Sequence, residues 1–187
     1  ILKSIKLKNK TLSKDLKLNI IKEESKSKIS NKLLIKNISI NSKIIKKHDV
    51  FFAIKGKRLD GNKFVPEAIK KKSSFAVVNR VNKNCSPYKQ IKVDNSLNFL
   101  SKCSSIFREN INAKIISITG SCGKTTLKEM IGLTLGKISK TTYSPESFNN
   151  KYGVPLSLFN LKQNDNFGVF EVGMDKKGEI DDLTKII

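Results

Sequence analysis

The stretch from Ser117 to Met130, SITGSCGKTTLKEM, carries glycine, lysine and threonine in the order that phosphate-binding loops use. The common loop has a glycine five places before the glycine of Gly-Lys-Thr, and here that place is Ile118. An apolar run, residues 114–119, leads into the loop, and a helical pattern follows it. Strand, glycine loop and helix form the setting in which a helix N-terminus binds phosphate. The stretch therefore predicts a nucleotide site, with a spacing that departs from the common one.

The polar residues of this loop match the chemistry of a phosphate site. Gly120 and Gly123 let the backbone turn tightly and expose N–H groups to an anion. Lys124 would reach the β- and γ-phosphates, the Thr125 hydroxyl would ligate Mg²⁺, and Thr126 adds a second polar anchor. An ordinary strand-to-helix turn could also contain these residues, so the loop by itself leaves both interpretations open.

Two further segments supply polar groups downstream. Glu171 follows the apolar residues of FGVFEV, a predicted strand over residues 167–172. Ligands gather at the carboxyl ends of parallel strands, where this carboxylate could hold Mg²⁺ directly or through water. A strand-end glutamate can also simply face solvent. The amides of Asn149 and Asn150 could contact phosphate or only satisfy a turn.

The rest of the chain alternates strand and helix patterns, which favours an α/β fold with a mostly parallel sheet covered on both faces. We expect a small N-terminal α/β domain over residues 1–94 and the first part of a nucleotide-binding domain over 95–187. The predicted strands are 33–40, 50–54, 75–78, 114–119 and 167–172; helices are predicted over 62–72, on the face formed by Leu97, Leu100, Cys103 and Phe107, on the face formed by Leu127, Ile131 and Leu135, and over 154–161, and 141–150 is predicted to be a turn.

Composition narrows the class of protein further. The formal charge is +21, but lysine supplies most of it and is spread along the chain, which disfavours nucleic-acid recognition. The three cysteines lie far apart, so the sequence suggests neither a disulfide framework nor a metal site built on them. No apolar run reaches the length of a membrane span, and no leader is evident. We expect a cytoplasmic, monomeric protein, of which these residues are a fragment.

Three motifs in order are similar to those of the Mur ligase family, the ATP-dependent amide-bond-forming enzymes of peptidoglycan precursor synthesis. The family's shortened loop, Thr-Gly-[Ser/Thr]-x-Gly-Lys-[Thr/Ser]-[Thr/Ser], is matched at every fixed position by Thr119 to Thr126. The second motif is SFNNKYGVPL, residues 147–156, and the third is EVGM, residues 171–174, followed by GEI at 178–180. The shortness of the loop is thus a feature of the family.

The resemblance implies particular site residues. In the first domain it covers Asn-Ser-Lys at 41–43, HDVF at 48–51 and GKRLDGNKF at 56–64, with departures at Asn41, Lys43, His48 and Asn62. It therefore implies UDP-substrate contacts only for Ser42, Asp60 and Gly61. It also implies Lys124 as the catalytic residue and Thr125 with Glu171 as Mg²⁺ ligands. The residues implied to bind ATP are Gly120, Ser121, Cys122, Gly123, Lys124, Thr125, Thr126, Asn149 and Asn150.

The continuation Thr126-Leu-Lys-Glu-Met130 is most similar to the branch of the family that adds D-alanyl-D-alanine to UDP-N-acetylmuramoyl-tripeptide. That branch would form an acyl phosphate from ATP and then an amide. The alternatives are a related ligase, either the branch that adds the third amino acid or a folate polyglutamylating enzyme, or a basic nucleotide- or nucleic-acid-binding module without ligase activity. The family's carbamylated lysine has no counterpart before Ile187. We expect the 187 residues alone to be inactive.

Overall fold

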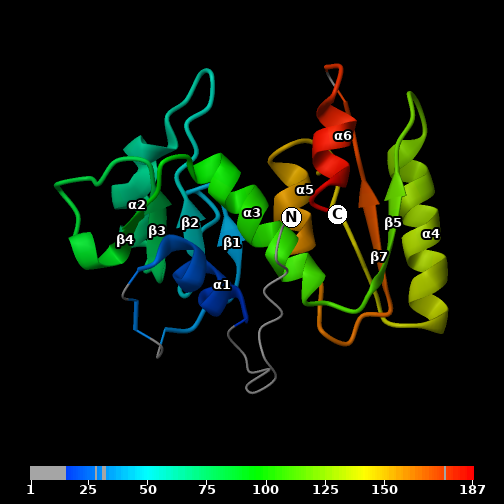
Figure 1. The fold of residues 1–187 in the computed structure, drawn as a ribbon, viewed down its shortest axis with the longest axis horizontal. Coiled ribbons are helices and arrows are strands. Elements are labelled where there is room, and N and C mark those ends of the chain that lie inside the picture. The colour runs from blue at the N-terminus through cyan, green and yellow to red at the C-terminus, as the bar shows by residue number, and fades with distance from the viewer. Residues whose placement is uncertain (1–15, 28, 31–32, 175) are drawn as a thin grey trace.

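The computed structural model describes residues 16–27, 29–30, 33–174 and 176–187, which form two sheets surrounded by helices (Figure 1). The first sheet has the strand order β1-β2-β3-β4 and the second β5-β7-β6, and every neighbouring pair is parallel. The predicted α/β class with parallel sheets is confirmed. The strands are β1 (Ile38–Ser39), β2 (Val50–Phe52), β3 (Phe75–Val78), β4 (Gln90–Lys92), β5 (Lys114–Ile118), β6 (Thr141–Tyr143) and β7 (Phe167–Glu171).

The helices connect these strands and cover their faces. In Figure 1, α3 runs between the two sheets, and α4 lies on the outer side of the second one. No described helix has both the length and the apolar character needed to cross a membrane. The helices are α1 (Leu16–Ser25), η1 (Gly61–Phe64), α2 (Val65–Lys70), η2 (Pro87–Lys89), α3 (Ser96–Glu109), α4 (Lys124–Ile138), α5 (Gly153–Leu158) and α6 (Glu179–Thr184).

The central strands of the first sheet, β2 and β3, are buried on both faces, as expected of a parallel sheet covered by helices. Alternate side chains enter two different cores. Phe51 and Ala76 pack with α2, whereas Phe52 and Val77 join a larger core that also includes α1 and α3. This alternation follows from the two-residue period of a strand.

Helix α3 joins the two sheets through its buried side chains. Asn95 caps its start by accepting hydrogen bonds from the N–H groups of residues 97 and 98 at 2.9 and 3.0 Å. At one end Phe99 stacks on Phe52 of β2, and at the other Phe107 packs on Phe159 after α5, with ring centroids 6.2 and 5.2 Å apart. One hydrophobic core thus runs through both halves, and the domain boundary at residue 94 stays a prediction.

Some predicted elements differ from the observed ones. The strand predicted over 33–40 narrows to β1, because its partner β2 begins only at Val50, after a turn. Residues 31–32, just before it, lie outside the described ones. The segment predicted as a turn at 141–150 begins with β6, which pairs with β7. The elements α1, α6 and β4 were not predicted, since their weak or short apolar patterns carry little periodicity.

The buried face of α4 agrees with the prediction only in part, since Ile131 and Leu135 are partly buried. Leu127, on the face predicted from the apolar spacing, is 48% exposed, whereas Lys128 and Gly132 are buried. A Cβ atom at Gly132 would lie 2.7 Å from the ring of Tyr143, so only glycine allows β6 to approach the helix this closely. Packing against the sheet therefore selects a stripe that hydrophobicity alone does not identify.

Candidate functional site

The strand order of the second sheet brings three loops together at its carboxyl edge. Because β7 lies between β5 and β6, its last residue, Glu171, is flanked by the segments that follow both neighbours. Ile118 at the end of β5 is in register with Glu171. The loop 119–123, the segment 144–152 and the end of β7 therefore meet at one place, where ligands of parallel sheets collect.

The loop 119–123 has the backbone of an anion-binding turn. Gly120 and Gly123 have φ angles of 146° and 74°, a range in which a side chain would be strained. The loop leads directly into α4, a helix of 15 residues, so its N–H groups and the positive end of the helix point the same way. Ser121 and Cys122 are exposed in the loop, and Thr126 is exposed on the first turn of α4.

Lys124 lies over the same loop. Its ammonium group donates a hydrogen bond to the carbonyl oxygen of Gly120 at 2.7 Å and a longer one to that of Ser121 at 3.5 Å. The side chain therefore folds back across the loop. From this position the ammonium group can meet a phosphate that the backbone N–H groups hold.

Glu171 is the centre of the site. Its side chain is buried, with 1% of the residue exposed. The Thr125 hydroxyl donates to one carboxylate oxygen and the Asn149 amide to the other, each at 2.7 Å. Both donors are neutral, and within the described part of the chain no Lys, Arg or His forms an ion pair with Glu171. The carboxylate thus has hydrogen-bond partners without a neutralising charge.

This arrangement fits Mg²⁺ held together with a nucleotide. A carboxylate and a hydroxyl are the hard oxygen ligands that Mg²⁺ prefers, and a buried carboxylate without a counter-charge favours a cation beside it. No group of three or more His, Cys, Asp or Glu residues in the described ranges could enclose a metal ion. Magnesium commonly binds through one or two protein oxygens, with water and phosphate completing its coordination. Thr125 and Glu171 would supply that protein share.

The two asparagines of the segment 144–152 have different contacts. Asn149 reaches Glu171, and its carbonyl oxygen accepts a hydrogen bond from the N–H of Gly173 at 2.6 Å. Asn150 instead caps the start of α5, because its side-chain oxygen accepts from the N–H groups of Tyr152 and Gly153 at 3.0 Å. Of this pair, only Asn149 touches the cluster around Glu171.

The residues implied to contact the UDP-substrate lie at the carboxyl edge of the first sheet. The Ser42 hydroxyl donates to Glu67 of α2 at 2.7 Å. Asp60 caps η1 and forms an ion pair with Arg80 at 2.9 Å. A Cβ at Gly61 would lie 2.6 Å from a backbone nitrogen, so this glycine is required by close packing. Each of these residues already has a contact within the fold.

Hydrogen bonding and charge both stabilise the ionised form of Asp60. Its carboxylate accepts hydrogen bonds from the Asn62 side chain and backbone at 2.6 and 3.0 Å. These bonds, and then the nearby Arg80 guanidinium, hold the pKa of Asp60 below its ordinary value. The negative charge at this edge is therefore balanced by groups of the first sheet itself.

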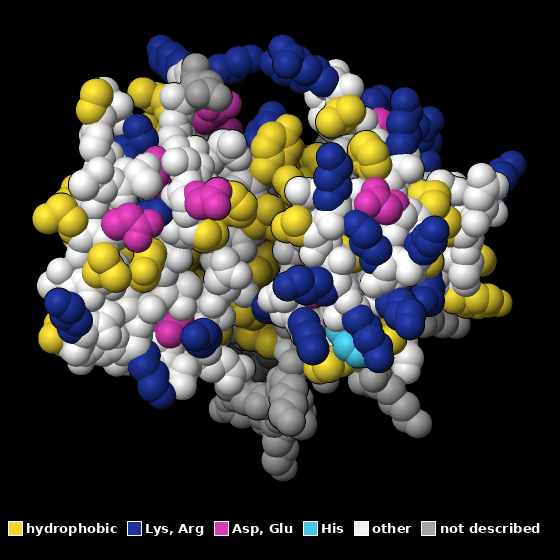
Figure 2. Space-filling model, turned by 180° about the vertical axis from the view of Figure 1, so that it is seen from behind, with side chains coloured by type: hydrophobic (Ala, Val, Ile, Leu, Met, Phe, Trp, Pro, Cys, Tyr) yellow, Lys and Arg dark blue, Asp and Glu magenta, His cyan; other side chains and the backbone are white. Residues whose placement is uncertain are grey.

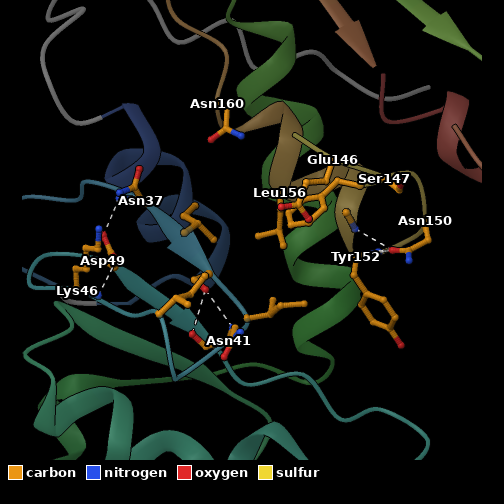
Figure 3. A pocket seen from close by; sticks show the side chains of 16 residues that line it. Asn37, Asn41, Lys46, Asp49, Glu146, Ser147, Asn150, Tyr152, Leu156 and Asn160 are labelled. Carbon is orange, nitrogen blue, oxygen red and sulfur yellow. Dashed lines mark hydrogen bonds between the residues drawn. The ribbon is translucent and has the colours of Figure 1, made fainter. Parts of the chain in front are cut away.

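A cavity of about 740 Å³ lies between the two halves, bounded by β1 on one side and by the segment 146–153 with α5 on the other. Figure 3 shows Asn41 facing this space from the first half, and Leu156 and Tyr152 lying on the second. Sequence reasoning missed it, because its lining comes from segments about a hundred residues apart and no motif joins them. The lining residues are Asn37, Ile38, Ser39, Ile40, Asn41, Ile44, Lys46, Asp49, Glu146, Ser147, Phe148, Asn150, Tyr152, Gly153, Leu156 and Asn160.

The basic residues are not gathered at one place, unlike the polar residues around Glu171. Figure 2 shows lysine and arginine side chains scattered over one face, between uncharged and hydrophobic groups. Proteins that bind nucleic acid instead gather their basic residues along one face or helix. The charge distribution on this face therefore does not favour the nucleic-acid alternative.

Comparisons with known proteins place the two halves in one family. Residues 34–108 match the Mur ligase family, catalytic domain, and residues 118–187 match the Mur ligase middle domain. A UDP-N-acetylmuramoyl-tripeptide--D-alanyl-D-alanine ligase from Buchnera aphidicola is 40% identical over 148 residues, which are 79% of this chain and 32% of that protein. The chain thus spans about a third of the length of that curated relative.

Solved structures give a similar result. The UDP-N-acetylmuramoylalanyl-D-glutamyl-2,6-diaminopimelate--D-alanyl-D-alanyl ligase from Acinetobacter baumannii has a TM-score of 0.81 and 31% identity, over 90% of this chain and 38% of that one. A MurF ligase from Thermotoga maritima, solved in complex with ADP, has a TM-score of 0.71 and 32% identity, over 84% of this chain and 36% of that one.

Proposed function

From the premise that this chain belongs to the Mur ligase family, we propose that it is the nucleotide-binding part of a ligase that adds D-alanyl-D-alanine to UDP-N-acetylmuramoyl-tripeptide. The observation that carries the proposal is the buried carboxylate of Glu171, held by Thr125 and Asn149 directly beside a phosphate-binding loop. The names of the similar ligases, and the ADP complex of one of them, support the choice of substrates.

In the proposed reaction the terminal carboxylate of the tripeptide attacks the γ-phosphorus of ATP, and ADP leaves. The amine of D-alanyl-D-alanine then attacks the acyl phosphate, and inorganic phosphate leaves as the amide forms. The backbone of residues 120–123 would hold the phosphates, and the ammonium of Lys124 would offset charge on the transferring group. Thr125 and Glu171 would hold Mg²⁺, which, when bound, neutralises charge on the phosphate oxygens.

The cavity between the halves is the proposed seat of part of the UDP-linked substrate. Its volume lies within the range of about 300–1,000 Å³ that is usual for small-molecule sites. Its lining mixes asparagine amides with apolar side chains, as such sites do. Ser42 directly follows Asn41 of this lining, whereas Asp60 and Gly61 are not among the lining residues. Substrate contacts by Ser42, Asp60 and Gly61 stay proposals, as does a monomeric, cytoplasmic enzyme.

The experiment that tests the function measures phosphate release by the complete protein. We expect release to require ATP, UDP-N-acetylmuramoyl-tripeptide and D-alanyl-D-alanine together. Release that instead requires UDP-N-acetylmuramoyl-dipeptide and a single amino acid would favour the branch that adds the third residue. Release that depends on neither peptide substrate would contradict both ligase assignments, and strongly salt-dependent binding to DNA or RNA would then favour the nucleic-acid module.

Lys124→Ala tests the assigned role of the loop. Removing the ammonium group should abolish amide formation, because the charge on the transferring phosphoryl group is then left without this partner. Lys137→Ala is the matched control, since Lys137 is an exposed lysine on the same helix. Full turnover by Lys124→Ala would contradict the role proposed for Lys124.

A further inference from the structure

Lys128 of α4 is a buried lysine outside the phosphate-binding loop. None of its side chain is exposed. The ammonium group donates to the carbonyl oxygens of Ser144 and Glu146 at 2.8 and 2.7 Å and lies 2.9 Å from a carboxylate oxygen of Glu129. A lysine ammonium has three N–H donors, so these three oxygens can use all of them. The group is fully satisfied by α4 and by one segment that lies next to it.

The acceptors belong to the segment that positions Asn149. Glu146 has a φ angle of 44°, an unfavourable backbone for a residue with a side chain, and Lys128 binds its carbonyl oxygen. Ser144 bonds both the lysine and the central strand, since its hydroxyl accepts from the N–H of Glu171 at 3.3 Å. Lys128 therefore binds two carbonyl groups of this segment, and both lie between β6 and Asn149 along the chain.

Two sets of hydrogen bonds connect α4 to Glu171. Thr125 and Lys128 are three residues apart on α4, so they lie on the same side of the helix. Thr125 reaches the Glu171 carboxylate directly, whereas Lys128 reaches it through the backbone segment that ends in Asn149. The two donors that fix the carboxylate are thereby tied to one helix.

An apolar side chain would be the simpler occupant of a fully buried position. Moving an ammonium group out of water is unfavourable, and replacing buried charges by well-packed apolar groups is often neutral or stabilising. What an apolar residue cannot supply is a set of donors for two inward-facing carbonyl groups. The contacts of Lys128 therefore indicate that the ammonium group is needed to hold the backbone of the segment 144–149 in its conformation.

We propose that Lys128 is a positioning residue that fixes the segment 144–149, so that Asn149 and Thr125 hold Glu171 in the orientation needed to bind a magnesium nucleotide. The inference rests on the proposed function, because it takes Glu171 as the cation ligand. It adds a residue that touches neither the nucleotide loop nor the Glu171 side chain.

The test compares the binding of a fluorescent ADP analogue by the complete protein with and without Mg²⁺. Lys128→Met keeps an unbranched chain of about the length of the lysine's aliphatic part and removes the ammonium group. The Mg²⁺ concentration at half-saturation should rise about tenfold, the size expected when a group that supports a metal ligand is lost. Analogue affinity in EDTA should stay unchanged, because the loop 119–123 is intact.

The controls separate positioning from simple stability. Lys137→Met removes an exposed lysine of the same helix and should leave the Mg²⁺ dependence unchanged. A purely structural role for Lys128 predicts a lower melting temperature with an unchanged Mg²⁺ dependence, and that result would overturn the proposal. If Lys128→Met does not fold, Lys128→Arg is used instead; it keeps the charge but replaces the compact ammonium group by a planar guanidinium. An unchanged Mg²⁺ dependence in folded Lys128→Arg would also overturn the proposal.

The same assay distinguishes failure of this inference from failure of the proposed function. Wild-type protein that binds the analogue without any response to Mg²⁺ would contradict the cation site at Glu171, and with it the proposed chemistry. A normal response in the wild type together with an equal response in folded Lys128 variants would overturn only the role of Lys128.

Discussion

Each sheet has a hydroxyl group hydrogen-bonded to a carboxylate near its carboxyl edge, and the donor–acceptor distance is the same in both pairs. Ser42 donates to Glu67 in the first half and Thr125 donates to Glu171 in the second, both at 2.7 Å. Glu67 is 39% exposed in its side chain and has its own cation, Lys71, at 2.9 Å. Glu171 is buried and has none among the described residues. The same bond therefore adds to an ion pair in one place and holds a carboxylate without an internal cation in the other.

The surroundings of Glu67 explain why it needs no further partner. The hydrogen bond from Ser42, and then that from Lys71, hold the pKa of Glu67 below its ordinary value. A second matched pair makes the same contrast, since the Asn62 amide donates to Asp60 at 2.6 Å and the Asn149 amide to Glu171 at 2.7 Å. Asp60 also has Arg80 beside it. The presence or absence of an internal cation distinguishes the two edges.

The largest effect is expected from neutralising the carboxylate without a cation. Glu171→Gln should lower phosphate release by about 10³-fold, because metal-assisted charge stabilisation is worth several kcal/mol. The melting temperature should stay equal or rise, since the variant no longer buries an uncompensated charge. Turnover and thermal unfolding are measured on the same preparation.

Glu67→Gln is the matched control for that variant. It changes a carboxylate that Lys71 already neutralises, so turnover should stay close to that of the wild type. Equal losses of turnover in Glu67→Gln and Glu171→Gln would contradict the contrast between the two edges.

The next largest effect concerns two glycines at the starts of helices, since Gly61 is the first residue of η1 and Gly123 directly precedes α4. Gly61→Ala would bring a Cβ atom within 2.6 Å of the Ile54 nitrogen, and should lower the free energy of unfolding by about 3 kcal/mol. Gly123 has open space around its Cβ position but a φ angle of 74°, so Gly123→Ala should cost only about 1 kcal/mol. Urea denaturation measures both values. A larger loss for Gly123→Ala would show that the backbone conformation matters more than the contact.

The two asparagine–carboxylate pairs provide a smaller and more specific test. Asn149→Ala should lower turnover about tenfold, because the amide orients the cation ligand, with little change in the free energy of unfolding. Asn62→Ala should lower the free energy of unfolding by about 1 kcal/mol and lower turnover less than Asn149→Ala does. Steady-state kinetics and urea denaturation of both variants check the prediction. A reversed pattern would contradict the contrast between the carboxylate that lacks an internal cation and the one that has Arg80 beside it.

The smallest effect is the pH dependence of the Asp60 cluster. The pKa of Asp60 is lowered in the folded state, so its ionised form contributes stability above the unfolded pKa and loses it as pH falls through the folded pKa. Asp60→Asn keeps a capping side chain and removes the charge, and should lower the free energy of unfolding by about 0.5 kcal/mol at neutral pH.

That difference should shrink as the pH is lowered below about 4 and vanish once wild-type Asp60 is protonated. Denaturation curves of both proteins between neutral and acidic pH measure it. A difference that grows toward acidic pH would mean that Asp60 is held in its neutral form, contrary to its contacts with Asn62 and Arg80.

Much of the fold could be predicted from local pattern. The strands β2, β3, β5 and β7 are short apolar runs, and α3 has apolar side chains at helical spacing with a capping asparagine before it. The strands β4 and β6, with the sequences QIK and TTY, gave no such pattern, because neither contains a run of apolar residues. Prediction thus succeeded where an element carried a run or a regular spacing of apolar residues.

The site could be predicted in its parts but not in its connections. The loop glycines, Lys124 and Thr125 follow from their spacing, and Glu171 follows from its place at the end of a strand. The different contacts of Asn149 and Asn150 could not be predicted, since neighbouring residues with the same side chain differ only in which partner the fold presents. The burial of Lys128 could not be predicted, because lysine is ordinarily an exposed residue.

By itself the sequence determined which chemical groups are available and the local backbone that carries them, because a turn or a helix start depends on residues within a few positions. The tertiary structure alone decided which carboxylate lacks a cation. Thr125 and Glu171 are 46 residues apart, and they meet because the order β5-β7-β6 sets the end of β7 between two loops. Charge balance at a buried site depends on every neighbour in space, and those neighbours are fixed only when the sheets pack.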